Sequence, residues 1–278
     1  MKIGVSSYSF SKYMNDTHAD YFKICDLAKE FGFDGIEFID LSLDVQPAES
    51  LEALAVAIRE HCASIDLPII AYTVGADFID HENELEHLKK QVDIAALLGA
   101  KVMRHDVSWR RDLDWREIID RVADDVRALT VYAEEKGVRT CTENHGFVMQ
   151  DSNRVEALIR TVNHPNYGWL VDMGNFMCAD EAPEKAVGVL APHAFHAHAK
   201  DFLYKPCTAA DPGTGWFGTR GGAYLRGTII GHGVVPVEAA IRILKRAGYD
   251  DTVAVEFEGL EPCEQALAIS LENLRKLV

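Results

Sequence analysis

The sequence lacks the features that mark secreted, membrane and disulfide-bonded proteins. No apolar run approaches the roughly 18 residues that cross a bilayer. The first residues, Met1 to Val5, lead into a strand-like segment without the apolar region of a signal peptide. The six cysteines are scattered and form no CxxC pair, which is typical of reduced thiols. We therefore expect a cytoplasmic protein without a membrane partner.

Positive charge is also scarce. The 28 Lys and Arg residues face 44 Asp and Glu residues, which gives a formal net charge of −16. Contact with a phosphate backbone requires clustered Lys and Arg. The composition therefore excludes a nucleic-acid partner.

What the sequence does contain is a repeated order of helix, glycine and short apolar strand. Gly32, Gly99, Gly137 and Gly248 each follow a helical pattern, and glycine readily takes the left-handed conformation that ends a helix. Eight strands are predicted, at 2–6, 35–38, 68–72, 101–105, 138–143, 168–172, 194–199 and 252–256. Alternating strands and helices predict a parallel sheet, and eight units predict a closed (β/α)8 TIM barrel in a single domain, 1–278. A doubly wound open sheet is disfavoured because no GxGxxG motif follows the first strand.

A long insert follows the seventh predicted strand. Residues 201–236 are rich in glycine but also contain aromatic residues and arginines. Connections longer than about 12–15 residues are usually functional or disordered. We expect an ordered lid on the face where barrel enzymes build their sites, with Arg220 and Arg226 contacting substrate.

Four predicted strands end on an acidic or imidazole side chain, namely Glu143, Asp172, His198 and Glu256. Adjacent strand ends converge in a barrel, and three carboxylates in one place repel one another unless a cation or protons intervene. Three carboxylates and one imidazole favour Mn²⁺, with Mg²⁺ or Co²⁺ as alternatives, over a closed tetrahedral Zn²⁺ site. The sequence therefore predicts one divalent metal ion.

Other polar residues accompany these strand ends. His145 follows Glu143 by two positions and titrates near neutral pH, so it is a candidate acid or base. Arg104 and His105 end the fourth strand and are expected to face the same mouth. Lys200 is expected to orient a substrate oxygen or to pair with a carboxylate.

The motifs around these residues resemble the xylose isomerase-like TIM barrels. They are 142–145 (Thr-Glu-Asn-His), 171–175 (Val-Asp-Met-Gly-Asn), 196–201 (His-Ala-His-Ala-Lys-Asp) and 255–259 (Val-Glu-Phe-Glu-Gly). That superfamily holds sugar isomerases and epimerases, inosose and dehydroshikimate dehydratases, and endonuclease IV. The resemblance covers essentially the whole chain. It implies that Glu143, Asp172, His198 and Glu256 hold one divalent ion and that the two glutamates exchange the proton.

The resemblance implies an isomerase or epimerase that acts on a small sugar or sugar derivative. It would remove a proton beside a carbonyl through a metal-stabilised enediolate. Loss of a β-substituent from the same species would instead give dehydration or elimination, and a metal-binding barrel without turnover is a further alternative. Asn175, expected at the substrate, stands where the epimerases commonly have histidine. The insert around 219–226 is similar to that of metal-dependent C-glycoside-cleaving subunits, which implies a small partner subunit; a homo-oligomer is the alternative.

Overall fold

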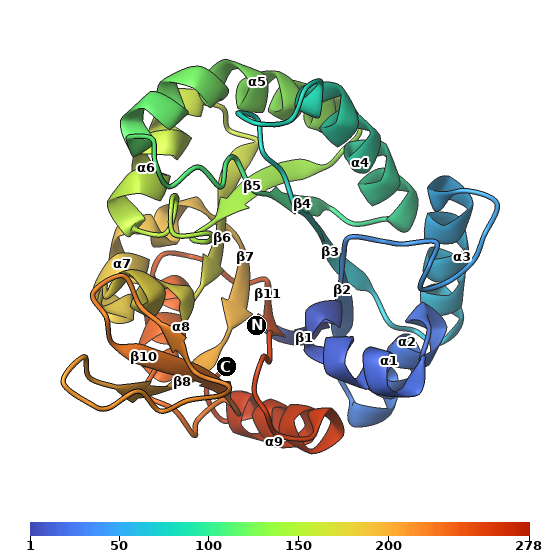
Figure 1. Ribbon diagram of the computed structural model, residues 1–278. Helices are drawn as coiled ribbons and strands as arrows, with labels where there is room; N and C mark the ends of the chain where they lie inside the picture. The colour runs from blue at the N-terminus through green and yellow to red at the C-terminus, as the bar shows by residue number, and fades with distance from the viewer.

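The computed structural model describes residues 1–278, and a closed barrel of eight parallel strands lies at its centre (Figure 1). The strands are β1 (Lys2–Ser6), β2 (Gly35–Ile39), β3 (Ile69–Val74), β4 (Val102–His105), β5 (Arg139–Glu143), β6 (Tyr167–Asp172), β7 (Ala194–Ala199) and β11 (Thr252–Val255). Each was predicted from the sequence to within two residues at either end. The predicted barrel is therefore confirmed.

Helices surround the barrel and cover its outer face (Figure 1). They are α1 (Ser11–Thr17), α2 (Tyr21–Phe31), α3 (Leu51–Ser64), α4 (Glu84–Leu98), α5 (Trp115–Glu135), α6 (Ser152–Val162), α7 (Pro183–Leu190), α8 (Val237–Arg246) and α9 (Cys263–Arg275). Gly32 and Gly99 end α2 and α4 with φ of 91° and 80°, as the sequence predicted. No helix combines the length and the apolar character needed to cross a bilayer.

Side-chain alternation along the strands determines what the barrel encloses. Residues two apart on a strand share a face, so Arg104 points to the barrel interior whereas His105 points to the helices. A layer of apolar side chains, Ala71, Val102, Cys141 and Leu170, packs together in the interior. Each of these four precedes a polar interior residue by two positions. The polar layer therefore lies nearer the C-terminal mouth, above an apolar floor.

The insert after β7 forms a small antiparallel sheet of β8 (Asp201–Lys205), β9 (Phe217–Gly218) and β10 (Tyr224–Thr228). Figure 1 shows this sheet projecting beyond the ring of helices. The buried carboxylate of Asp201 accepts backbone N–H groups from Gly231 and Gly233 at 2.9 Å each and from Val235 at 3.0 Å. These bonds tie the end of the insert to its start, so the segment is ordered, as predicted.

Candidate metal centre

Four side chains meet at the C-terminal mouth of the barrel. Glu143 and Asp172 are the last residues of β5 and β6, His198 lies on β7, and Glu256 directly follows β11. Asp172 and His198 are register partners on adjacent strands. One ligand atom from each of the four buried residues lies within 4.8 Å of the others. The structure therefore brings together the complete ligand set predicted from the sequence.

Two atoms of this cluster are buried without a hydrogen-bond partner. The Oδ1 of Asp172 accepts the backbone N–H groups of Gly174 at 2.8 Å and Asn175 at 2.7 Å. Its Oδ2 and the Nδ1 of His198 lie 3.9 Å apart, and neither has a hydrogen-bond partner. Charged groups stand close to both atoms, because Oδ2 is 3.4 Å from Lys200 Nζ and Nδ1 is 3.4 Å from Glu256 Oε1. Orphaned buried polar atoms are rare in native proteins because each one has lost its contact with water. The two atoms therefore fit a divalent cation held between them.

Glu37 holds His198 in the orientation that such a cation requires. The Oε2 of this fully buried carboxylate lies 2.8 Å from Nε2 of His198 and 2.9 Å from Nε2 of His196, and its Oε1 accepts the Thr73 hydroxyl at 2.5 Å. When Nε2 of His198 donates to Glu37, Nδ1 keeps its lone pair and faces the cluster. A carboxylate behind a ligating histidine commonly fixes its tautomer in this way.

Sequence reasoning gave Glu37 no role. The signal was present, because an acidic residue stands in the middle of the apolar segment Gly35–Ile39. His196 lies two residues before His198, on the same face of β7 and one layer deeper, with its Nε2 2.9 Å from Glu37 Oε2.

Two cations lie against the cluster but do not neutralise it. The Nζ of Lys200 is 2.6 Å from Glu256, 3.4 Å from Asp172 and 3.5 Å from Glu258. The Nη2 of Arg104 is 2.9 Å from Glu143 and 2.8 Å from Asp106. Each cation is thus shared with a carboxylate outside the ligand set. Burial, together with the charges of Glu143 and Glu256, raises the pKa of Asp172 to about 7 despite Lys200.

A cleft of about 260 Å³ opens over the cluster. His145 lines it, with its Nδ1 2.9 Å from the Arg104 Nη2 and 3.2 Å from the Asp106 Oδ1. A neutral ring can accept from Arg104, and a protonated ring can donate to Asp106. Burial lowers the pKa of His145, but the bond to Asp106 and the negative charges of Asp106 and Glu143 together outweigh burial and the Arg104 charge, so the net shift is upward. His145 was predicted from the sequence, whereas Asp106 was not, although Asp106 directly follows the polar end of β4.

Tyr8 and Trp109 also line the cleft and were not predicted. The Trp109 ring meets the edge of His145 with a centroid distance of 5.1 Å. Tyr8 lies in the 3-10 helix Ser7–Phe10 that follows β1, and Trp109 lies in the loop after β4. At neither place does an aromatic side chain in the sequence indicate which way it points.

Of the six residues predicted to contact substrate, three lie in or beside the cleft and three lie elsewhere. Arg104 and Lys200 line the cleft. Asn175 lies beside it with its amide engaged inside the protein, because Nδ2 donates to Glu143 at 2.9 Å and Oδ1 accepts from Lys200 at 3.3 Å.

His105, Arg220 and Arg226 are not placed in the cleft. His105 packs between Phe78 and Tyr167 in the helix layer, where burial lowers its pKa to about 4. The expectation that it faces the mouth is wrong, because Arg104 already occupies the inward position of β4.

The two arginines of the insert lie elsewhere on the mouth side. Arg220 pairs with Asp151 at 2.6 Å. The Arg226 guanidinium lies over the Trp216 ring, 5.6 Å from its centroid. The insert therefore does not place these arginines over the metal cluster.

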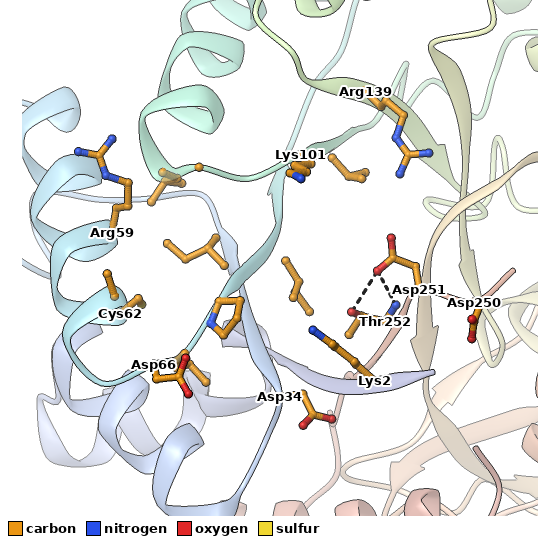
Figure 2. A pocket seen from close by; sticks show the side chains of 18 residues that line it. Lys2, Asp34, Arg59, Cys62, Asp66, Lys101, Arg139, Asp250, Asp251 and Thr252 are labelled. Atoms are coloured by element: carbon orange, nitrogen blue, oxygen red, sulfur yellow. Dashed lines mark hydrogen bonds between the residues drawn. The ribbon is translucent and has the colours of Figure 1, made fainter.

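A larger cavity, of about 600 Å³, is at the opposite end of the barrel (Figure 2). Its wall includes Lys2, Arg139 and Thr252, which begin β1, β5 and β11. Four basic and four acidic residues line it, so it has no net charge to select a ligand. Functional sites of such barrels lie at the C-terminal end of the strands, and we therefore assign the candidate site to the smaller cleft.

Fold and site together define a class, the (β/α)8 barrels with a buried carboxylate–histidine cluster at the mouth. Residues 25–277 match the sequence profile of the family described as xylose isomerase-like TIM barrel. The chain belongs to this family.

Among curated proteins, the chain is 26% identical to the uncharacterised protein YihM of Escherichia coli (strain K12) over 174 residues. The match covers 63% of this chain and 48% of YihM, so it spans about half the length of that relative.

Solved structures share the fold at low sequence identity. The IolI protein with a bound zinc atom has a TM-score of 0.77 and 19% identity, over 100% of this chain and 98% of IolI. The D-allulose 3-epimerase of Methylomonas sp. has a TM-score of 0.76 and 15% identity, over 100% and 98% of the two chains. The probable 3-DHS dehydratase AsbF of Bacillus anthracis has a TM-score of 0.75 and 18% identity, over 99% of each chain.

Replacing Glu37 with glutamine is expected to weaken Mn²⁺ binding roughly 10- to 100-fold, because a carboxylate that orients a ligating histidine through its other ring nitrogen contributes about that much. Isothermal titration of the metal-depleted protein measures this. Glu258→Gln is the matched control, since Glu258 contacts Lys200 but not His198, and it should change the affinity much less. Equal affinities of Glu37→Gln and wild type would show that His198 does not need this partner.

Metal affinity is expected to rise with pH. Asp172 must be ionised to bind a cation, and its pKa in the metal-free protein is about 7. Below that pH a proton competes for Oδ2, so the apparent affinity should fall by roughly tenfold per pH unit for each proton displaced. Titrations at pH 6, 7 and 8 in buffers of different ionisation enthalpy count the released protons. An affinity that is constant from pH 6 to 8 would contradict the pKa assignment.

Proposed function

We propose that the protein is a divalent-metal-dependent isomerase or epimerase that acts on a small sugar or sugar derivative. The observation that carries this proposal is the pair of unpartnered buried atoms, Asp172 Oδ2 and His198 Nδ1, inside a cluster of three carboxylates and one imidazole. The donor set favours Mn²⁺ or Mg²⁺ over a closed zinc site. The family and the epimerase among the structural relatives support the reaction class.

The cleft provides the environment that proton transfer beside a carbonyl requires. A divalent ion at the cluster would act as a Lewis acid toward a carbonyl oxygen and a neighbouring hydroxyl. Lys200 and Arg104, both more than nine-tenths buried, add fixed positive charge on the same side. Charge that develops on substrate oxygen would then be stabilised by groups that need no reorganisation.

Glu143 and Glu256 are the first candidates for moving the proton. They extend from β5 and from the end of β11, on either side of Asp172 and His198 in the strand order. Both glutamates line the cleft. The oxygens of Glu143 are held by Asn175 and Arg104, and those of Glu256 lie 2.6 Å from Lys200 Nζ and 3.4 Å from His198 Nδ1. One glutamate would remove a proton from one face of the substrate and the other would return it.

His145 supports a second candidate function, a dehydratase or other lyase. In the protonated ring, Nδ1 donates its proton to Asp106 in a hydrogen bond, and Nε2 carries a second proton. Donation of the Nε2 proton to a departing hydroxyl group leaves a neutral ring that is still held by Asp106. Proton removal by a glutamate and proton donation by His145 would together eliminate water, and the dehydratase among the structural relatives supports this candidate.

Solvent deuterium exchange tests the proposal. The protein is incubated in D₂O with a panel of ketoses, keto-acids and inososes, and NMR follows exchange of the protons beside the carbonyl. We expect exchange with Mn²⁺ present, its loss after chelation, and its recovery on adding Mn²⁺, Mg²⁺, Co²⁺ or Zn²⁺ in an order that identifies the ion. A rearranged sugar indicates isomerisation, and a dehydrated product indicates elimination.

The melting temperature provides the control for chelation. An ion that binds only the folded state stabilises it, so chelation should lower the melting temperature whether or not the substrate panel contains the true substrate. Undiminished exchange by protein verified to contain no metal would contradict the proposed function.

A further inference from the structure

A second cavity, of about 490 Å³, lies at the same end of the barrel as the cleft. We refer to it as the arginine chamber, because its lining includes Arg110, Arg111, Arg154 and Arg220. Its walls come from the loop after β4, the start of α5, the loop after β5 and the tip of the insert.

The chamber and the cleft share a wall. Trp109 and His145 line the cleft, whereas Arg110, which follows Trp109, and Phe147, two residues after His145, line the chamber. The same two loops therefore contribute to both cavities. The ring of Trp109 packs so closely on Gly146 that an added Cβ there would lie 3.2 Å from it.

The chamber contains an excess of positive charge in a chain with a net charge of −16. Arg110 pairs with two carboxylates, those of Asp80 and Asp112, which leaves one excess negative charge there. Arg154 and Arg220, in contrast, share the single carboxylate of Asp151, at 2.9 and 2.6 Å.

Arg111 has no carboxylate partner at all. Its guanidinium lies on the Phe147 ring, 4.3 Å from the centroid. The only acidic residue among the lining groups, Asp114, is the N-cap of α5 and accepts the N–H of Arg116 at 2.8 Å. Arg111, Arg154 and Arg220 therefore face one shared carboxylate. With the second carboxylate at Arg110 counted, the chamber keeps one net positive charge, and Arg111 is the arginine without a carboxylate partner.

Two of these arginines, Arg154 and Arg220, are held in place before any ligand arrives. Arg220 donates to the carbonyl of Phe147 at 2.7 Å, and Arg154 donates to the carbonyl of Val148 at 2.9 Å. The planar guanidinium groups match the oxygens of phosphate and carboxylate, and pre-positioning reduces the entropy lost on binding. The Trp115 and Phe147 rings supply apolar wall beside them.

We infer that the arginine chamber binds the phosphate or carboxylate group of a small molecule. The group is either the anionic arm of the substrate in the adjoining cleft or a separate small anion. The chamber also accounts for Arg220, which is at the mouth but outside the cleft. Anion binding in the chamber does not depend on the proposed reaction. Only the assignment of the bound anion to the substrate's own arm rests on the proposed function.

Titration with inorganic phosphate at constant ionic strength tests the chamber, with tryptophan fluorescence and melting temperature as readouts. We expect saturable binding by the metal-loaded wild type and at least roughly tenfold weaker binding by Arg111→Gln, because a charge-assisted hydrogen bond is lost. The control is Arg246→Gln, which removes the same charge from the exposed end of α8 and should bind within about twofold of wild type, because it lies outside the chamber.

Two further comparisons keep the test decisive. Arg111→Lys keeps the charge but loses the planar fork, so its affinity should lie between those of wild type and Arg111→Gln. Phosphate held at the metal cluster instead would bind all these variants alike. That result, or the absence of saturable binding by wild type, would overturn the inference.

The source of the anion is decided by comparing D-glucuronate with D-glucose. If the chamber takes the substrate's own anionic arm, D-glucuronate binds more tightly than D-glucose and competes with phosphate, and Arg111→Gln removes the difference. If it takes a separate anion, the two sugars bind alike and phosphate binds alongside them. The phosphate titration is independent of turnover, so failure of the proposed reaction leaves its result valid.

Discussion

Asp172→Asn is expected to abolish binding of the divalent ion and to lower kcat/KM by roughly a thousandfold or more. A bound cation contributes several kcal/mol to the stabilisation of charge in the transition state, and about 1.4 kcal/mol corresponds to a factor of ten in rate. Asparagine keeps the Oδ1 acceptor that holds the N–H groups of Gly174 and Asn175. It replaces only Oδ2, the atom without a hydrogen-bond partner.

Stability separates this loss of a ligand from misfolding. Burial and neighbouring carboxylates raise the pKa of Asp172 to about 7 in the folded protein, well above the value of about 3.9 for an unperturbed aspartate. Its ionisation therefore opposes folding increasingly as pH rises from about 4 to 7, and fully above that range. Above pH 7, the metal-free Asp172→Asn variant should be at least as resistant to urea as metal-free wild type. Retained metal stoichiometry and retained activity would exclude Asp172 as a ligand.

His145→Ala is expected to retain the metal and to lose roughly 10²- to 10⁴-fold in kcat, which is the usual contribution of a placed acid or base. His145 contacts Arg104 and Asp106 but none of the unpartnered ligand atoms. Metal affinity should therefore change little, and kcat rather than KM should carry the effect. The exposed His87 on α4 is the matched control, and His87→Ala should behave as wild type.

The pH profile identifies the role of His145. Its pKa is raised in the folded protein, so a general acid at this position would stay protonated, and active, to higher pH than an ordinary histidine. The decline of kcat on the alkaline side should disappear in His145→Ala. If that variant turns over at the wild-type rate, both proton transfers belong to Glu143 and Glu256, and the lyase alternative loses its acid.

The ligand set could be read from the sequence because each member lies at a strand end. Glu143, Asp172, His198 and Glu256 each close an apolar segment, and in a parallel barrel all such ends meet at one mouth. The local pattern therefore implied the distant contact. The same logic failed for His105, since consecutive residues of a strand point to opposite faces and only one of the pair 104–105 can enter the barrel.

Arg220 and Arg226 show a different limit. The composition of the insert that contains them and its place after β7 indicated a functional loop, and the insert is ordered. Its path depends on long-range bonds, such as that of Arg220 to Asp151, 69 residues away. No periodicity encodes such a contact, so the sequence could not tell whether these arginines reach the cleft or the chamber beside it.

The sequence alone determined the barrel, its strand boundaries and the four side chains at its mouth, because hydrophobic periodicity and strand ends are local properties. Only the tertiary structure decided what surrounds them. Glu37 reaches His198 from β2, 161 residues away, because the barrel closes and both side chains point inward. Arg111 lies on the Phe147 ring without a carboxylate partner, because the loops after β4 and β5 meet there. Both arrangements depend on which side chains share a small buried space, and that is settled by packing and by the pairing of charges rather than by any pattern along the chain.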